Sequence, residues 1–150
     1  MLESRSCLQK VFFIKYDDKE KIATVKGVDQ NFYNVSRIEP NIAAGKPALI
    51  ENGIKYNQSN KPVVVVSHQV NDEFLELRFE DNGIGIEEEY REKVFQFFKR
   101  LHGSTEYEGT GIGLGLCKKI VQNYNGIIFV KALEKGGSVF IIQFPKSLVT

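Results

Sequence analysis

The 150-residue sequence has few cysteines and no long apolar run, and each scarcity excludes a class of protein. Cys7 and Cys117 lie far apart, with no CxxC or cysteine–histidine pattern beside either. This usage predicts free thiols in a reducing compartment. No segment approaches the length of about 20 apolar residues that a membrane span needs. The first ten residues lack the apolar core of a signal peptide, so we expect a cytoplasmic domain without direct membrane contact.

The sequence also lacks an excess of charge of either sign. It has 20 basic and 19 acidic residues, for a net charge of +1. A domain that binds nucleic acid usually carries a basic excess, so we do not expect nucleic acid as a partner. Hydrophobic residues make up 42% and charged residues 26% of the chain, which is ordinary for a globular protein. Residues 1–150 are enough for a single domain with its own core.

Hydrophobic patterning predicts six strands and three helical segments, with no internal repeat. The strands are expected at 10–18, 21–29, 63–70, 73–81, 127–132 and 138–144. Helical character is expected within 35–57, with a kink or fresh start near Gly45–Pro47, and at 112–126. Residues 87–101 are expected to form a short helix and an aromatic-rich segment. Strands grouped with helices in this order predict an α+β two-layer sandwich, with a mixed or antiparallel sheet and helices on one face.

The segment EDNGIGI (80–86) places an acidic residue at the end of a predicted strand, directly before Gly-x-Gly. Gly83 and Gly85 permit close approach and unusual backbone dihedrals. The Asp81 carboxylate can accept a hydrogen bond from an amino group lying above the glycines, as adenine presents. The alternative is an ordinary turn, the commonest use of Asp, Asn and Gly together.

The segment GTGIGLGL (109–116) places small residues directly before a predicted helix. Exposed backbone amides and the helix dipole favour anions there, so the segment could hold phosphates. It is not a Walker A motif, because no Gly-Lys-Ser/Thr follows, and it lacks the preceding strand of a dinucleotide-binding turn. The alternative is a flexible hinge.

The segment LIENGIKY (49–56) places Asn52 and Tyr56 one helical turn apart, with Lys55 adjacent. An amide oxygen can bind Mg²⁺, a lysine can meet phosphate, and a tyrosine can stack on a base. The alternative is an ordinary amphipathic helix.

Together and in this order, these segments resemble the ATP-binding catalytic domain of sensor histidine kinases, in the gyrase/Hsp90/histidine-kinase/MutL ATPase superfamily. LIENGIKY is similar to the N box, EDNGIGI to the first glycine box, VFQFFKRL (94–101) to the F box, and GTGIGLGL to the second glycine box. The likeness covers about residues 47–145, and it is especially close to phytochrome-like and PAS-linked kinases over 100–121. The resemblance implies a Bergerat-type sandwich with a mixed, mainly antiparallel sheet, to which residues 1–40 contribute the first strands.

The resemblance implies a role for each matching position, with ATP and Mg²⁺ as the ligands. Asp81 would bind the adenine amino group, and Asn52 would coordinate Mg²⁺ between the phosphates. Lys55 would lie near the phosphates and Tyr56 near the base. The remaining residues would shape the adenine pocket or turn backbone amides toward the phosphates: Gly83, Gly85, Ile86, Gly109, Thr110, Gly111, Ile112, Gly113 and Leu114.

The resemblance also implies a mobile ATP lid over residues 87–110, anchored at one end by Phe95, Phe97 and Phe98. Arg100 and His102 on this lid could reach the γ-phosphate, which makes them candidate catalytic residues beside Lys55. The alternative is that both are solvated lid residues.

The sequence departs from the family at several positions. Ala48 stands where many members carry a polar residue and the hydrolytic branches carry a water-activating Glu, which disfavours a hydrolytic ATPase and puts tight Mg²⁺ binding in doubt. Gly53 replaces the usual Ala, at a cost of about 0.8–1.0 kcal/mol in helix propensity. His68 and His102 precede Gln69 and Gly103, so neither has the acidic neighbour of a phosphoacceptor histidine.

We therefore expect a domain that binds Mg-ATP and donates the γ-phosphate to a histidine on a separate dimerisation domain of a longer parent, with a response regulator downstream. The isolated domain would be a monomer and inactive alone, in the cytoplasm or as the cytosolic part of a membrane-bound sensor. Two alternatives stay open: a stand-alone serine kinase of the anti-sigma type, and a degenerate module that binds a partner.

Overall fold

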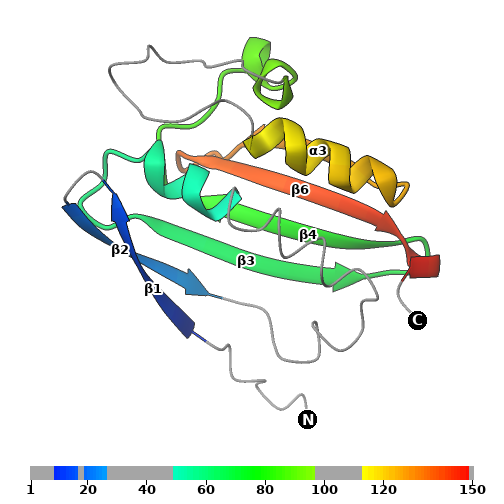
Figure 1. Ribbon diagram of the computed structural model, residues 1–150, viewed down its shortest axis with the longest axis horizontal. Coiled ribbons are helices and arrows are strands. Elements are labelled where there is room, and N and C mark those ends of the chain that lie inside the picture. The colour runs from blue at the N-terminus through cyan, green and yellow to red at the C-terminus, as the bar shows by residue number, and fades with distance from the viewer. Residues whose placement is uncertain (1–8, 17–18, 27–48, 97–112, 149–150) are drawn as a thin grey trace.

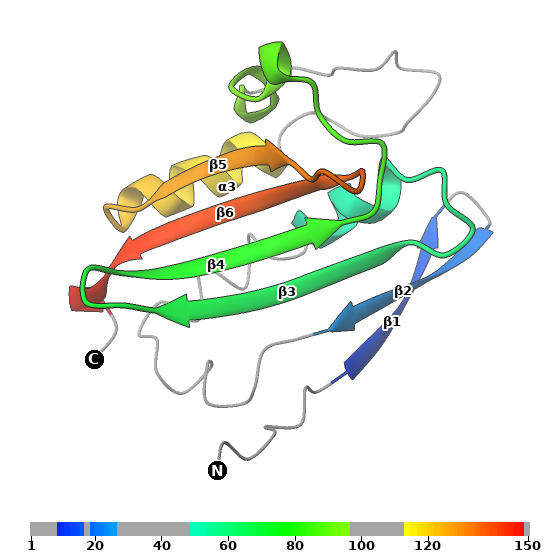
Figure 2. The ribbon, with the colours of Figure 1, turned by 180° about the vertical axis from the view of Figure 1, so that it is seen from behind.

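The protein is described by a computed structural model, which defines residues 9–16, 19–26, 49–96 and 113–148. Two layers make up this part of the chain: a twisted sheet, and a helical layer that covers one face of it (Figure 1). Seen from behind, the strands lie in front of the helices (Figure 2). The predicted α+β sandwich with helices on one face is confirmed.

The sheet has six strands in the order β1-β2-β3-β4-β6-β5. Every neighbouring pair is antiparallel except β2 and β3, which are parallel, so the predicted mixed and mainly antiparallel sheet is confirmed. The strands are β1 (Gln9–Tyr16), β2 (Lys19–Lys26), β3 (Val63–Val70), β4 (Phe74–Asp81), β5 (Ile127–Ala132) and β6 (Ser138–Pro145).

Strand alternation decides where the core lies. Leu75, Leu77 and Phe79 of β4 are each at most 2% exposed, as their alternation with charged residues predicts. The register pairs them with three buried residues of β6: Phe144, Ile142 and Phe140. Full burial of one such side chain contributes roughly 1.5–3 kcal/mol, so this double row is a large part of the stabilising apolar area.

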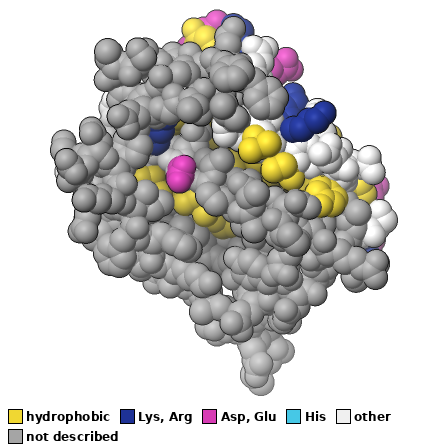
Figure 3. Space-filling model, in the orientation of Figure 1, with side chains coloured by type: hydrophobic (Ala, Val, Ile, Leu, Met, Phe, Trp, Pro, Cys, Tyr) yellow, Lys and Arg dark blue, Asp and Glu magenta, His cyan; other side chains and the backbone are white. Residues whose placement is uncertain are grey.

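The helical layer consists of α3 (Gly113–Asn123) and helical residues 49–55. Leu49 and Ile54 from the first helical segment, and Cys117 and Val121 from α3, are each 2% exposed and belong to the same core cluster as β4 and β6. On this side of the molecule, hydrophobic and basic side chains gather over α3 (Figure 3). Leu116 of α3 is 46% exposed.

The C-terminus of α3 lies at the predicted stop signal. Asn125 adopts a left-handed φ of 58°, and the Gly126 N–H donates to the Val121 carbonyl at 3.0 Å. A Cβ on Gly126 would lie 2.8 Å from the Gln143 carbonyl oxygen. Asparagine therefore reverses the chain, and glycine lets β5 begin directly against β6.

The short helix predicted within 87–101 is not a single α-helix in the part of this range that the structure describes, residues 87–96. Two separate 3-10 turns occur instead, η1 (Glu88–Tyr90) and η2 (Lys93–Phe95), and the chain is extended at Gln96. Val94 and Phe95 are adjacent in sequence and both buried. The backbone is extended at Gln96, with a ψ of 137°, so no α-helix continues through this segment. The predicted kink near Gly45–Pro47 lies outside the described residues.

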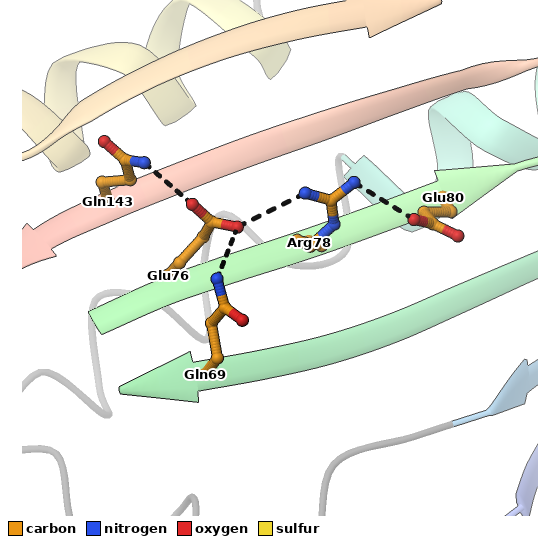
Figure 4. A network of polar contacts seen from close by, with 5 residues as sticks. All are labelled: Gln69, Glu76, Arg78, Glu80 and Gln143. Carbon is orange, nitrogen blue, oxygen red and sulfur yellow. Dashed lines mark hydrogen bonds and ion pairs between the residues drawn. The ribbon is translucent and has the colours of Figure 1, made fainter. Parts of the chain in front are cut away.

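The second face of the sheet carries a polar network (Figure 4). The Glu76 carboxylate accepts hydrogen bonds from Gln143 Nε2 at 2.8 Å and from Gln69 Nε2 at 3.4 Å. Arg78 lies between Glu76 and Glu80, with contacts of 3.4 and 3.3 Å. The network therefore ties β3, β4 and β6 together on the side away from α3. Within the defined ranges, no helix is both long and apolar enough to span a membrane.

Candidate nucleotide-binding site

The candidate site is built around Asp81, the last residue of β4. Its side chain is buried, and three donors hold it in place. Oδ1 accepts the Gly83 N–H at 2.9 Å and the Ser138 N–H at 3.3 Å, and Oδ2 accepts the Ser138 hydroxyl at 2.8 Å. A carboxylate offers about four acceptor directions, so the three bonds leave Oδ2 able to accept one more.

Burial raises the pKa of Asp81 above its ordinary value, and the hydrogen bonds from Gly83 and Ser138 oppose that shift. Desolvation is the larger influence, because it penalises the charged form of a side chain withdrawn from water. A buried carboxylate that keeps an acceptor direction is suited to an N–H donor on a ligand.

Three glycines let backbone and side chains approach Asp81 closely. A Cβ on Gly137 would lie 1.9 Å from the Asp81 carbonyl oxygen, and a Cβ on Gly83 would lie 2.4 Å from the Tyr56 carbonyl oxygen. On Gly53 it would lie 2.9 Å from Asp81 Cβ. The sequence showed Gly53 only as a loss of helix propensity. The structure shows that this glycine lets the helix pack directly on the carboxylate.

The first glycine box leads from Asp81 back to the helical segment. The Ile84 N–H donates to the Tyr56 carbonyl at 3.0 Å. Gly85 has a φ of +80°, which favours glycine, and the predicted need for unusual dihedrals is thereby confirmed at this position. Ile86 is half-buried against the core. Asp81, Gly83, Gly85 and Ile86 thus lie on one continuous turn.

Asn52 and Lys55 lie within helical residues 49–55 and Tyr56 directly follows them, beside the turn that begins at Asp81. All three are half-buried. Lys55 Nζ lies 5.2 Å from the centre of the Tyr56 ring, a cation–π distance. The helical face predicted for these residues is therefore present, and it adjoins the carboxylate through Gly53.

Of the second glycine box, only the part from Gly113 onward is described. Gly113 is the first residue of α3 and is exposed, and Leu114 packs against the core. The free N–H groups of a helix N-terminus attract anions. The other predicted positions lie outside the described residues, namely Ala48, Phe97, Phe98, Arg100, His102, Gly109, Thr110, Gly111 and Ile112.

Sequence reasoning missed Ser138, which supplies two of the three donors to Asp81. Ser138 begins β6, 57 residues after Asp81, and only the sheet register brings the two together. A signal was present: Gly136 and Gly137 directly precede a strand, and paired glycines indicate close backbone approach. Asn57 and Asn82 were also missed as neighbours of the site.

Comparison with known proteins agrees with this geometry. Residues 48–148 match the family described as histidine kinase-, DNA gyrase B-, and HSP90-like ATPase. The chain is 37% identical over 97 residues to the phytochrome-like protein Cph1 of Synechocystis sp. (strain ATCC 27184 / PCC 6803 / Kazusa), covering 65% of this chain and 13% of Cph1. It is 35% identical over 128 residues to the adaptive-response sensory kinase SasA of Rippkaea orientalis (strain PCC 8801 / RF-1), covering 85% of this chain and 33% of SasA.

The fold is also found in solved structures. The mycobacterial sensor histidine kinase MprB superposes with a TM-score of 0.61 and 24% identity, covering 81% of this chain and 74% of that one. The chain spans between an eighth and a third of the lengths of Cph1 and SasA, so these relatives are much longer proteins. The predicted resemblance to phytochrome-like kinases is confirmed. The chain belongs to the histidine kinase-, DNA gyrase B- and HSP90-like ATPase family, as a domain of the sensor histidine kinase type.

Proposed function

We propose that this domain binds Mg-ATP and presents its γ-phosphate to a histidine on a separate dimerisation domain of the same parent protein. The observation that carries the proposal is the buried Asp81 carboxylate, held by Gly83 and Ser138 with one acceptor direction left. That direction suits the adenine amino group, which donates a hydrogen bond. Membership of an ATPase family supplies the nucleotide class.

The residues beside Asp81 would contact the other parts of the nucleotide. Lys55 supplies positive charge near the phosphates, and Tyr56 offers a ring face to the base. The N–H groups at the start of α3, from Gly113 and Leu114, favour an anion. Gly109, Thr110, Gly111 and Ile112, which precede α3 in the chain, extend this amide cradle in the proposal.

The residues present fit a magnesium ion that is shared with the phosphates. Magnesium takes hard oxygen ligands and is usually bound by one or two protein groups together with substrate phosphates. The Asn52 amide oxygen is such a ligand, on a half-buried side chain beside Gly53. Among the residues that the structure describes, no group of three or more His, Cys, Asp and Glu could hold a metal by itself. When bound, the ion would neutralise charge on the phosphates.

Phosphoryl transfer to histidine needs little covalent chemistry from this domain. The transition state is loose, so catalysis is mostly positioning and charge neutralisation. Asp81 would fix the base, Lys55 would neutralise charge, and Arg100 and His102 of the lid over 87–110 would reach the γ-phosphate. The acceptor histidine belongs to the dimerisation domain in this proposal, and a response regulator receives the phosphoryl group. We place the isolated domain in the cytoplasm as a monomer.

The test is calorimetric titration of the 150-residue chain with ADP and a non-hydrolysable ATP analogue, with and without Mg²⁺. We expect micromolar binding that strengthens with Mg²⁺. Asp81→Asn should weaken it by about 10- to 150-fold, because a hydrogen bond to a charged group is worth about 1.5–3 kcal/mol. The new amide nitrogen would face the base as a donor and could not accept from the adenine amino group.

Asp72→Asn is the matched control, because it makes the same chemical change at a fully exposed carboxylate. This variant should bind as the wild type does. If the wild-type chain binds no nucleotide up to millimolar concentration, or if both variants weaken binding equally, the proposal is wrong. The domain would then be a partner-binding module that keeps only the fold.

A further inference from the structure

Two asparagines beside the candidate site form a hydrogen-bonded bridge between the end of the helical segment and the end of β4. Asn57 follows helical residues 49–55 and is 3% exposed, and Asn82 directly follows Asp81. Asn57 Nδ2 donates to Asn82 Oδ1 at 2.7 Å and to the Gly53 carbonyl at 3.1 Å. This side-chain contact joins the helical segment that contains Asn52 to the turn that begins at Asp81.

Backbone groups fix the orientation of both amides. The Val63 N–H donates to Asn82 Oδ1 at 2.8 Å, and the Ser59 N–H donates to Asn57 Oδ1 at 2.9 Å. A backbone N–H can only donate, so each of these positions must be an oxygen. The nitrogen of Asn57 is thereby turned toward Asn82, and Asn82 Nδ2 toward the Lys61 carbonyl at 3.1 Å.

The bridge lies where the two halves of the site must keep a fixed separation. Asn52 and Lys55 belong to the helical half, and Asp81 and Gly83 to the strand half. The halves touch through Gly53 on Asp81 and through the Ile84 N–H on the Tyr56 carbonyl. Gly53 has no side chain to lock this contact. The Gly53 carbonyl and the Asn82 amide are instead both held by the one nitrogen of Asn57.

We propose that Asn57 and Asn82 are positioning residues that set the distance between the adenine-binding and the phosphate- and magnesium-binding halves of the site. The inference rests on the proposed function, and it concerns residues to which that function assigns no contact with the base or the phosphates. A nucleotide would span both halves. Loss of the hydrogen bond between Asn57 and Asn82 should therefore weaken the contribution of the helical half to nucleotide affinity. That contribution is measured as the gain in ADP affinity on adding Mg²⁺.

Two isosteric variants with the same charge change separate the bridge from its surroundings. Asn57→Asp puts an oxygen against Asn82 Oδ1 and the Gly53 carbonyl, so the bridge is replaced by acceptors facing each other. Asn71→Asp makes the same chemical change at an exposed asparagine between β3 and β4, where Oδ1 accepts the Glu73 and Phe74 N–H groups and can stay an oxygen. We expect the magnesium-dependent gain in ADP affinity to fall about tenfold in Asn57→Asp and to stay within about twofold of wild type in Asn71→Asp.

The measurement is titration calorimetry with ADP in EDTA and in Mg²⁺, alongside thermal unfolding of each variant. Equal gains in all three chains, equal losses in both variants, or a lower melting temperature in Asn57→Asp with an unchanged gain would each overturn the inference. Asn57→Ala removes the bridge without opposing oxygens and replaces Asn57→Asp if that variant does not fold. A wild-type chain that binds no nucleotide contradicts the proposed function as well, whereas binding with equal gains contradicts only the bridge.

Discussion

At the scale of single residues, Asp81 is held in a state that folding alone does not favour. Burial raises the pKa of its carboxyl above 3.8, so the ionised form that would accept from adenine is disfavoured by its surroundings. Gly83 and Ser138 offset part of this by donating to the charged form. We therefore expect the ionised Asp81 carboxylate to matter more for the proposed nucleotide binding than for the stability of the fold.

The raised pKa gives a testable pH dependence of stability. The folded chain holds the Asp81 proton to a higher pH than the unfolded chain does, so the free energy of unfolding falls as pH rises from about 3.8 through the folded pKa. Above that window this effect is constant. Asp81→Asn has no such proton, so its stability relative to wild type should increase with pH across the window.

The measurement is urea unfolding of wild type, Asp81→Asn and Asp72→Asn at several pH values from acid to neutral. The Asp72→Asn curve should run close to the wild-type curve, since the Asp72 side chain is fully exposed and its contact with Lys146 is 3.7 Å. Parallel curves for wild type and Asp81→Asn would show that the Asp81 pKa is not raised in the folded chain.

At the scale of elements, the turn between β5 and β6 holds the strand that carries Ser138 against the end of β4. Gly136 and Gly137 have nearly the same φ, 92° and 89°. Their surroundings differ: a Cβ on Gly136 meets nothing within 4 Å, whereas a Cβ on Gly137 would lie 1.9 Å from the Asp81 carbonyl oxygen. Substitutions at these two glycines therefore distinguish the cost of backbone strain from the cost of a steric clash.

Gly136→Ala should lower the free energy of unfolding by about 1–3 kcal/mol, the usual cost of strain at positive φ. Gly137→Ala should cost more, because strands β4 and β6 must also separate, and it should weaken ADP binding by displacing Ser138. Chemical unfolding and calorimetry would measure both. Equal losses of stability in the two variants would mean that the close approach at Gly137 relaxes freely.

Local patterns predicted most of these elements because their causes are local. The alternation of Leu75, Leu77 and Phe79 with charged residues identified β4, and Asn125-Gly126 identified the end of α3. The segment that holds η1 and η2 was predicted as helix because its composition favours one. In the structure Val94 and Phe95 are instead buried in one core with residues of α3 and the sheet, and such tertiary packing can override local preference.

At the scale of the whole molecule, the site also combines contacts that a local motif predicts with contacts that depend on the assembled fold. Asp81 and Gly83 are two residues apart, so their relation is readable from a short motif. The partnership of Asp81 with Ser138 depends on the register of β4 on β6, which pairs Glu80 with Val139. The bridge from Asn57 to Asn82 depends on how the helical layer sits on the sheet. Such contacts follow from the assembled fold, and no local spacing indicates them.

The two faces of the sheet differ in what holds them together. The helix face is an apolar core, whereas the second face depends on the Glu76 network that joins β3, β4 and β6. Glu76 is 6% exposed, and its loss leaves donors of Gln143 and Gln69 without their acceptor. Arg78 keeps Glu80 as a second partner. We therefore expect the amide donors to account for most of the energetic coupling of Glu76.

Glu76→Ala should lower the free energy of unfolding by about 1.5–3 kcal/mol, the range for losing a hydrogen bond to a charged group. Double-mutant cycles with Gln143→Ala and Gln69→Ala would divide this between β6 and β3. The coupling with Gln143 should be the larger, because its nitrogen lies 2.8 Å from the carboxylate and that of Gln69 lies 3.4 Å away. Nucleotide affinity should not change, since the network lies on the face away from α3 and the Asn52 helix. A larger coupling with Gln69, or a loss of ADP binding in Glu76→Ala, would show that the two faces are not independent.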